Sequence, residues 1–201
     1  MIEIEEKHYI GQGKLQKCYI HPDNDNLCLK IKINEQYENP RVNREVKYYK
    51  KIQKKHISAP FFAKYYGEVN TNLGVAHIYD LIKDETTNNV SLTMDDYLKM
   101  GNSPFSDELF ISKLEKLKKL MIKHKIIVRD LMGKNICCKV LKNKSVELII
   151  IDGVGHRDFI PLVEWIHFFT NRKINKIFYK NKLNSMDDHR DWLALYVAKQ
   201  I

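Results

Sequence analysis

The chain has 201 residues, 44% of them hydrophobic and 29% charged, which predicts one globular domain or two small lobes rather than several independent modules. Its 34 Lys and Arg outnumber its 25 Asp and Glu and leave a formal net charge of +9, a balance that favours nucleotides, phosphorylated sugars, acidic peptides or nucleic acid as partners. No apolar stretch approaches the roughly 18 residues that a membrane span requires, and the acidic start of the chain lacks the basic region of a secretory signal.

Residues 1–84 are expected to form a strand-rich lobe that carries one helix. Runs of β-branched and aromatic residues between turn residues predict strands, which we place at 7–10, 17–21, 27–33, 61–69 and 73–81. Apolar residues at helical spacing, beginning with Val42 and Val46, predict a helix at 41–54.

Residues 85–201 are expected to form a helical lobe with a small β patch. Thr93 and Asp96 resemble a capping box, and Ser106 precedes a long amphipathic pattern with acids in its first turn. Shorter patterns predict strands at 126–128, 136–140 and 146–151 and final helices at 161–169 and 187–199. The expected fold class is therefore α+β.

The four Cys (Cys18, Cys28, Cys137 and Cys138) form no C-x-x-C pair. Their spacing fits neither a zinc site nor the disulfide framework of a small secreted protein. We therefore expect free thiols, with Cys137 and Cys138 in an apolar run, and a cytoplasmic location.

Two features of the first lobe could contact an anionic ligand. Gly11 and Gly13 lie in a turn between predicted strands, where glycines let backbone amides approach phosphates closely. Strand alternation places Lys30 and Lys32 on one face of the sheet. Either this face is simply solvated, or Glu45 of the following helix pairs with Lys30 and orients it toward an anionic ligand.

The most specific segment is IVRDLMGKNI at 127–136. Asp130 and Asn135, in a loop between a long helix and an apolar strand, supply a carboxylate to orient a hydroxyl and an amide oxygen for a metal. Asp152-Gly153 follows an apolar run, and a carboxylate at the end of a buried strand suits Mg²⁺. Each motif alone could be turn chemistry, but together they are a specific signal.

These motifs, taken in chain order, resemble the set of the protein-kinase superfamily. The set comprises Gly11/Gly13, Lys30, Glu45, the loop Arg129-Asp130-Leu131…Asn135, and Asp152-Gly153. More narrowly, four segments are similar to the YrbL family, bacterial proteins linked to the PhoP regulatory network; they are KCYIHP (17–22), CLKI (28–31), REVKYY (44–49) and YDLI (79–82).

The resemblance implies a compact bilobal protein-kinase-like fold, with a β-rich N-lobe at 1–84 that carries one αC-like helix, a small helical C-lobe at 85–201, and ATP between the lobes. It implies that Lys30 contacts the α- and β-phosphates, that Glu45 holds Lys30, and that the Gly11–Gly13 turn covers the phosphates. The hinge beside adenine would be formed by Tyr79, Asp80 and Leu81.

The resemblance also implies an ATP- and Mg²⁺-dependent phosphotransferase. Asp130 would orient or deprotonate the acceptor hydroxyl, with Arg129 beside it in the catalytic loop, and Asn135 and Asp152 would bind Mg²⁺. No Ala-Pro-Glu follows Asp152, which leaves little room for peptide docking and favours a sugar, a lipopolysaccharide component or another small molecule as acceptor; an atypical protein kinase is the other reading.

Two further hypotheses remain open. A regulatory pseudokinase of the YrbL type would bind nucleotide or a partner protein without turnover; the chain departs from the kinase pattern at Val128 and at Gly153-Val154-Gly155, but it keeps Asp130. Nucleic-acid binding rests only on the net charge and on Lys interleaved with aromatic residues at 165–182, a pattern that more simply predicts a packed amphipathic helix, so nucleic acid is not expected.

Overall fold

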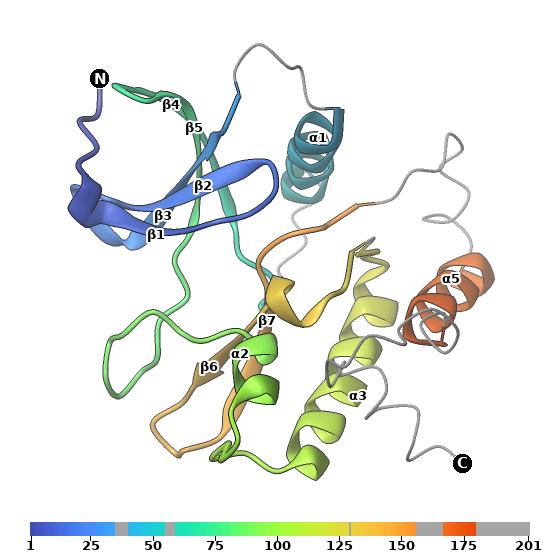
Figure 1. Cartoon of the computed structure of the whole chain (residues 1–201). Coiled ribbons are helices and arrows are strands. Elements are labelled where there is room, and N and C mark those ends of the chain that lie inside the picture. The colour runs from blue at the N-terminus through green and yellow to red at the C-terminus, as the bar shows by residue number, and fades with distance from the viewer. Residues whose placement is uncertain (35–39, 55–58, 129, 156–166, 180–201) are drawn as a thin grey trace. The chain divides into compact units, whose positions relative to one another are not determined.

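The computed structural model describes residues 1–34, 40–54, 59–128, 130–155 and 167–179 (Figure 1). The protein has an α+β structure made of two compact units. The first unit comprises Met1–Lys55 and Ala63–Lys83, and the second comprises His56–Phe62 and Asp84–Ile201. Each unit is described below by itself.

The first unit is built on a five-stranded antiparallel sheet (Figure 1). Its strands are β1 (Tyr9–Gln12), β2 (Gln16–His21), β3 (Asn24–Lys32), β4 (Tyr65–Thr71) and β5 (Gly74–Asp80), in the spatial order β1-β2-β3-β5-β4. A short 3-10 helix, η1 (Glu6–His8), precedes β1, and α1 (Pro40–Lys54) follows β3. The predicted helix and five strands are present within a few residues of their expected positions.

One expected strand start is wrong. The run at 61–69 was expected to be a strand throughout, but β4 begins only at Tyr65. Phe61 and Phe62 belong to the second unit, where the Ile150 N–H donates to the Phe61 carbonyl oxygen at 2.9 Å and Phe62 forms a parallel bridge with Ile150. Phe61 and Phe62 are therefore buried in the second unit, whereas β4, which follows them, belongs to the first unit.

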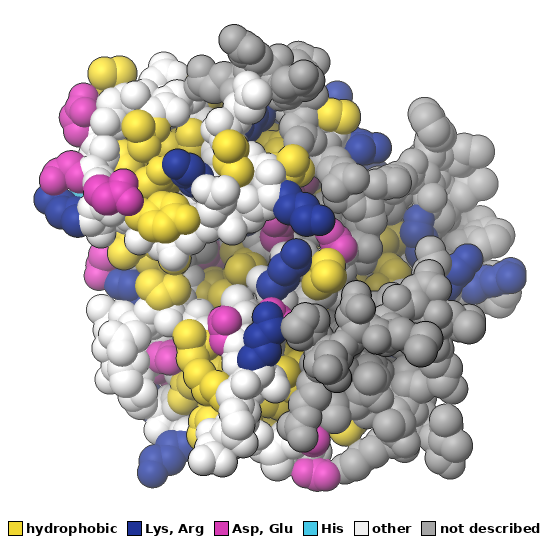
Figure 2. Space-filling model, viewed as in Figure 1, with side chains coloured by type: hydrophobic (Ala, Val, Ile, Leu, Met, Phe, Trp, Pro, Cys, Tyr) yellow, Lys and Arg dark blue, Asp and Glu magenta, His cyan; other side chains and the backbone are white. Residues whose placement is uncertain are grey.

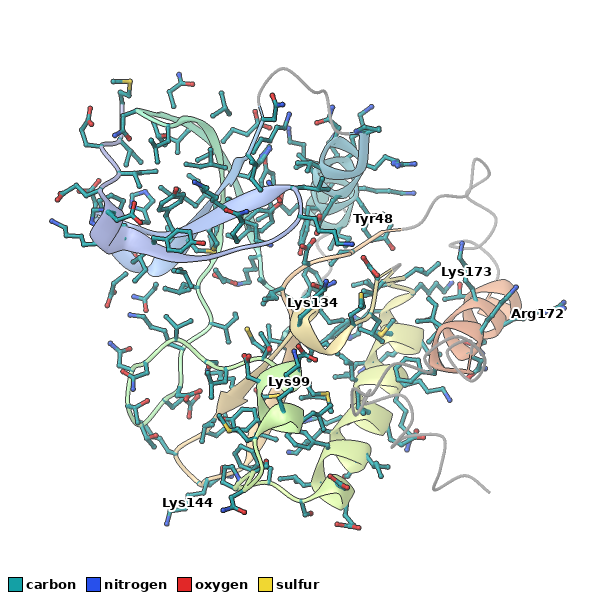
Figure 3. All side chains as sticks on the ribbon, viewed as in Figure 1. Tyr48, Lys99, Lys134, Lys144, Arg172 and Lys173 are labelled. Carbon is teal, nitrogen blue, oxygen red and sulfur yellow. The ribbon has the colours of Figure 1, made fainter. Side chains whose placement is uncertain are left out.

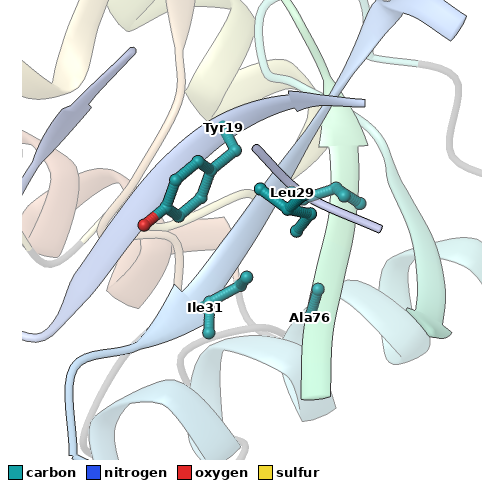
Figure 4. Packing of buried hydrophobic residues seen from close by; sticks show 5 residues of the cluster. Tyr19, Leu29, Ile31 and Ala76 are labelled. Atoms are coloured by element: carbon teal, nitrogen blue, oxygen red, sulfur yellow. The ribbon is translucent and has the colours of Figure 1, made fainter. Parts of the chain in front are cut away.

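The sheet of the first unit buries side chains on both faces. On one face Leu29 and Ile31 join a cluster completed by Ile4, Tyr19 and Ala76 (Figure 4). Burial of one such aliphatic side chain contributes roughly 1.5–3 kcal/mol. The other face is covered by α1, which buries Val42, Val46, Tyr49 and Ile52. Because successive strand residues point to opposite faces, Lys30 lies on the side of α1.

The second unit combines helices with a two-stranded sheet (Figure 1). Its described elements are α2 (Met94–Lys99), α3 (Asp107–His124), the 3-10 helix η2 (Gly133–Asn135), β6 (Ile136–Val140), β7 (Val146–Ile150) and α5 (His167–Tyr179). The expected capping box at α2 is confirmed, because Thr93 accepts a hydrogen bond from the Asp96 N–H while the Asp96 carboxylate accepts one from the Thr93 N–H. Ser106 caps α3 as expected.

The strand expected at 126–128 is wrong, because the segment forms no regular strand. Ile126, Ile127 and Val128 are fully buried, which explains their apolar pattern. The pairing of this segment with the one after β7 is short: the Gly155 N–H donates to the Ile127 carbonyl at 2.8 Å, and Val128 forms a bridge with Val154. The apolar pattern at 126–128 therefore indicates burial, and it does not predict a strand.

The C-terminal described helix, α5, packs its apolar side chains and exposes basic ones. Ile174 and Phe178 are fully buried, the Nζ of Lys118 on α3 lies 5.6 Å from the Phe178 ring centre, and Arg172 and Lys176 are exposed. Of the expected final helices, 161–166 and 187–199 lie outside the described residues. None of the described helices combines the length and the apolar composition that a membrane span requires.

Candidate functional site

Asn135 and Asp152 emerge from the same end of the β6–β7 hairpin. Ile136, the first residue of β6, pairs with Ile150, the last residue of β7. The pairing continues one step beyond the strands, because the Ile151 N–H donates to the Asn135 carbonyl oxygen at 2.9 Å. Strand register therefore brings the amide of residue 135 and the carboxylate of residue 152 to one place.

A hydrogen bond orients the side chain of Asn135. This residue is 8% exposed, and its Nδ2 donates to the backbone carbonyl of Asp130 at 2.8 Å. Its backbone N–H donates to the Met132 carbonyl at 2.8 Å, so both bonds close the loop around η2. Because the nitrogen end of the amide is used by the chain, Oδ1 is the end that can bind a cation.

Gly153 packs directly against Asp130. A Cβ atom on Gly153 would lie 2.9 Å from both the Cβ and the carbonyl oxygen of Asp130, and the φ of Gly153 is +78°. The two segments also pair beside this contact, since the Asp130 N–H donates to the Gly153 carbonyl at 3.5 Å and Val128 forms an antiparallel bridge with Val154. The Asp152-Gly153 turn is thereby held next to the loop that carries Asp130.

The three polar residues differ in exposure, and the difference suits different chemistry. Asp130 is exposed and can reach a bound molecule, whereas Asp152 is half-buried and its Oδ1 accepts the Gly153 N–H at 2.6 Å. A carboxylate and an amide oxygen are hard ligands that Mg²⁺ accepts together with phosphate and water. In the described ranges, no three His, Cys, Asp or Glu side chains gather into a metal cluster. Arg129, expected beside Asp130, lies outside the described residues.

In the first unit, Lys30 lies on an aromatic surface rather than on a fully solvated sheet face. Its Nζ is 4.7 Å from the centre of the Tyr79 ring, within cation–π distance. Tyr79 packs edge-on against Tyr49 of α1, with 5.4 Å between ring centres. The neighbours Leu29 and Ile31 point into the opposite core.

Glu45 lies on α1, one turn before Tyr49, so the two side chains share a helix face. Tyr49 contacts the ring of Tyr79, and the Lys30 ammonium lies over the same ring. Glu45 is therefore on the face of α1 that packs against the sheet face of Lys30. Both Lys30 and Glu45 are half-buried. The direct contact between them stays a prediction.

Gly11 and Gly13 flank the turn between β1 and β2, where the Gly13 N–H donates to the Gln16 carbonyl at 2.9 Å. Among the described residues, a Cβ atom on Gly11 would meet nothing within 4 Å, and one on Gly13 would meet only the Gln16 carbonyl oxygen at 3.8 Å. The described neighbours of this hairpin therefore leave room for a side chain at both positions, and their packing requires neither glycine.

Asp80 and Leu81, two of the residues expected beside adenine, are engaged within the first unit. The Asp80 carboxylate accepts the Tyr66 hydroxyl at 2.7 Å and the Lys64 N–H at 2.9 Å, and the hydrogen bond from the hydroxyl raises the pKa of Tyr66 to about 12. The Leu81 N–H donates to the Asn26 carbonyl at 2.8 Å. These hydrogen bonds hold the end of β5 within the first unit.

The family model described as "PhoP regulatory network protein YrbL" matches residues 2–184, nearly the whole chain. The chain belongs to the YrbL family. Two YrbL proteins, both called "Uncharacterized protein YrbL" and found in Escherichia coli (strain K12) and Shigella flexneri, are each 26% identical over 178 residues, which cover 88% of this chain and 84% of the relative. The YrbL resemblance of the sequence is thus confirmed.

Two polar residues of this YrbL-family chain were given no role by the sequence patterns. His77, only 7% exposed, pairs with Lys30 across β3 and β5; burial lowers its pKa, and the Glu68 carboxylate, 3.9 Å from its Nδ1, opposes that shift. Strand alternation could have identified it, because it lies two residues before Tyr79 on the same face. Lys134 lies exposed on η2, inside the segment that carries Asp130.

Proposed function

We propose that this YrbL-family chain is an ATP- and Mg²⁺-dependent phosphotransferase with a kinase-like fold that transfers the γ-phosphoryl group to a hydroxyl. The observation that carries the proposal is the meeting of Asp130, Asn135 and Asp152-Gly153 beside one end of the β6–β7 hairpin. Protein kinases use these residue types, in this chain order, to orient the acceptor and to hold Mg²⁺.

The first unit supports the same proposal. Its strand order is β1-β2-β3-β5-β4, and the helix that follows β3 carries Glu45. Kinases place the phosphate-binding Lys on the third strand and its partner Glu on the next helix, which is where Lys30 and Glu45 lie. The ring of Tyr79 beneath the Lys30 ammonium limits the positions of this long side chain, so less conformational entropy is lost when it binds phosphate.

The donor set of the second unit fits Mg²⁺. The Asn135 Oδ1 and the Asp152 carboxylate would hold it, and phosphate oxygens and water would supply the remaining ligands. Bound Mg²⁺ neutralises charge on the phosphates of the nucleotide. The Asn135 hydrogen bond to the Asp130 carbonyl ties the metal ligand to the acceptor-orienting loop, so both are positioned by one piece of backbone.

Asp130 would accept the proton of the acceptor hydroxyl, or orient that hydroxyl for in-line attack. Its exposure allows this contact, and the close packing of Gly153 on its backbone restricts where its carboxylate can lie. Positioning of this kind is the main protein contribution to phosphoryl transfer, because the reaction needs little covalent chemistry from the enzyme.

A thermal-shift titration with Mg²⁺ and ATP tests the proposal. Nucleotide at one hundred times its Kd should stabilise the fold by about 2.7 kcal/mol. Asp152→Asn should abolish the part of the shift that depends on Mg²⁺, whereas the matched variant Asp23→Asn, in the exposed turn between β2 and β3, should keep it. A Mg²⁺-dependent shift that survives in Asp152→Asn contradicts the metal role.

A second candidate follows from the family description, which names a regulatory network. In that case the chain binds nucleotide and signals without turnover. Measurement of ADP formation over a broad acceptor screen separates the two: transfer that disappears in Asp130→Ala supports the phosphotransferase, and nucleotide binding without transfer to any acceptor supports the regulator.

A further inference from the structure

The backbone of η2 lies directly against α2. A Cβ atom on Gly133 would be 3.2 Å from the Asp95 nitrogen and 3.3 Å from the Asp95 Cα and Cβ. A side chain at this position would fit only if the start of α2 moved by a few tenths of an ångström. Lys134, the next residue, therefore starts beside the first turn of α2.

Asp95 also holds Lys99. The Lys99 Nζ lies 2.6 Å from the Asp95 Oδ2 in an i,i+4 pair, and this hydrogen bond raises the pKa of the Lys99 ammonium. The Lys99 side chain remains 57% exposed. Asp95 thus lies against Gly133 through its backbone and binds Lys99 through its carboxylate.

Lys134 is exposed, and among the described residues no carboxylate lies within ion-pair distance of its Nζ. Figure 3 labels Lys134 on η2 and Lys99 on the neighbouring α2, and Figure 2 shows basic side chains next to each other on this face of the second unit. This face presents two ammonium groups: Asp95 pairs with that of Lys99, and none of the described carboxylates pairs with that of Lys134.

One member of this pair, Lys134, belongs to the loop proposed to orient the acceptor. Lys134 immediately precedes Asn135, whose amide holds the Asp130 carbonyl at 2.8 Å. A molecule whose hydroxyl reaches the exposed Asp130 carboxylate would therefore bring its other groups close to Lys134. A charge-assisted hydrogen bond from an ammonium to a phosphate is stronger than one to a neutral group.

We propose that Lys134, with Lys99 beside it, binds an anionic group of the acceptor, and that the acceptor is a small alcohol that already carries a phosphate, such as a sugar phosphate. This inference rests on the proposed function and names the substrate class of the same site. The exposed ammonium of Lys134, with the Asp95-paired Lys99 beside it, matches one compact anionic group better than the extended row of carboxylates of an acidic peptide.

The transfer step balances without a further reactant. The acceptor hydroxyl oxygen forms a bond to the γ-phosphorus of ATP, and the bond from that phosphorus to the β–γ bridging oxygen breaks, so ADP leaves with the bonding electron pair. The hydroxyl proton passes to the Asp130 carboxylate and then to solvent. Lys134 keeps its proton throughout and contributes binding and orientation only.

The test measures binding by amide NMR on the full chain with Mg²⁺ and a non-hydrolysable ATP analogue present. The probes are glucose 6-phosphate and glycerol 3-phosphate, compared with glucose and glycerol. The phosphorylated probes should perturb the amides of Gly133, Lys134 and Lys99, and the parent alcohols should not. Lys134→Gln should weaken this binding at least about tenfold, as loss of a charged hydrogen bond does, and Lys134→Arg should retain it.

Lys144→Gln is the matched control, since Lys144 is also exposed but lies in the turn between β6 and β7 (Figure 3). The inference is wrong if neither phosphorylated probe perturbs these amides at roughly 10 mM, ten times a millimolar Kd. It is also wrong if an oligoglutamate peptide binds there instead, or if Lys134→Gln and Lys144→Gln have equal effects.

The same spectra separate failure of the inference from failure of the proposed function. Titration of the nucleotide analogue before any probe should perturb the amides of Asp152 and Gly153. If it does and the sugar phosphates then fail, the phosphotransferase proposal stands and the acceptor assignment falls. If the nucleotide analogue perturbs nothing, the proposed function itself is wrong, and the acceptor assignment fails with it.

Discussion

Replacement of Gly153 by Ala is expected to destabilise the second unit by about 2–5 kcal/mol. A non-glycine residue at a φ of +78° costs about 1–2 kcal/mol. The added Cβ would also lie 2.9 Å from the Asp130 Cβ and carbonyl oxygen, and such overpacking typically costs about 1–3 kcal/mol. The Asp130 loop cannot move away freely, because Asn135 holds its carbonyl.

Urea denaturation followed by circular dichroism measures this cost. With a slope of about 2 kcal/mol/M, the midpoint should fall by about 1–2.5 M. The matched control is Gly101→Ala: among the described residues a Cβ there meets nothing within 4 Å, so the free energy of unfolding should change by less than about 1 kcal/mol. Equal midpoints for the two variants would refute the packing of Gly153 on Asp130.

Three further predictions concern other parts of the chain. Burial lowers the pKa of His77 below its ordinary value of 6.5; Lys32, Lys50 and Lys30 add to this shift, and Glu68 opposes it. The unfolded chain therefore binds a proton on His77 at higher pH than the folded chain does. Stability is therefore complete above about pH 6.5 and falls as the pH drops toward the folded pKa; Tm measured from about pH 7 to about pH 5 should fall less in His77→Gln, and identical slopes would contradict this. Thr93→Ala removes the capping box of α2 and should cost about 1 kcal/mol in urea denaturation, while Thr86→Ala in an exposed turn should cost little. Burial raises the pKa of the Cys138 thiol, so mass spectrometry should find it unmodified by iodoacetamide in the folded protein and modified in urea; rapid modification without urea would show that it is accessible.

Sequence patterns correctly predicted the elements whose ends are marked by their own residues. The capping box at Thr93 and Asp96 forms as expected, and β6 begins and ends at the predicted residues 136 and 140. The predicted secondary structure was wrong where apolar residues are buried by segments that are distant in the sequence. Phe61 and Phe62 have the composition of a strand, but they belong to the second unit and pair with Ile150 there. Hydrophobicity predicts that such residues are buried, but it does not identify the segment that buries them.

The candidate site was predictable in its residues and not in the contacts that hold it. Asp130, Asn135 and Asp152 are recognisable from residue type and spacing. Their arrangement depends on the positive φ of Gly153 and on the Ile151 hydrogen bond to Asn135, which follow from strand register and close packing between distant segments. The aromatic surface under Lys30 likewise depends on the pairing of β3 with β5.

In the β6–β7 hairpin, the site residues and the connecting turn lie at opposite ends, so the length of the turn can change without moving the site. Residues 135 and 152 leave its paired end, whereas the turn at 141–145 lies at the opposite end of both strands. Extra residues in that turn would leave the register between Ile136 and Ile150 unchanged, so this is where the protein can accept an inserted tag or reporter. A single deletion inside either strand would instead turn its side chains to the other face and pull the two polar groups apart.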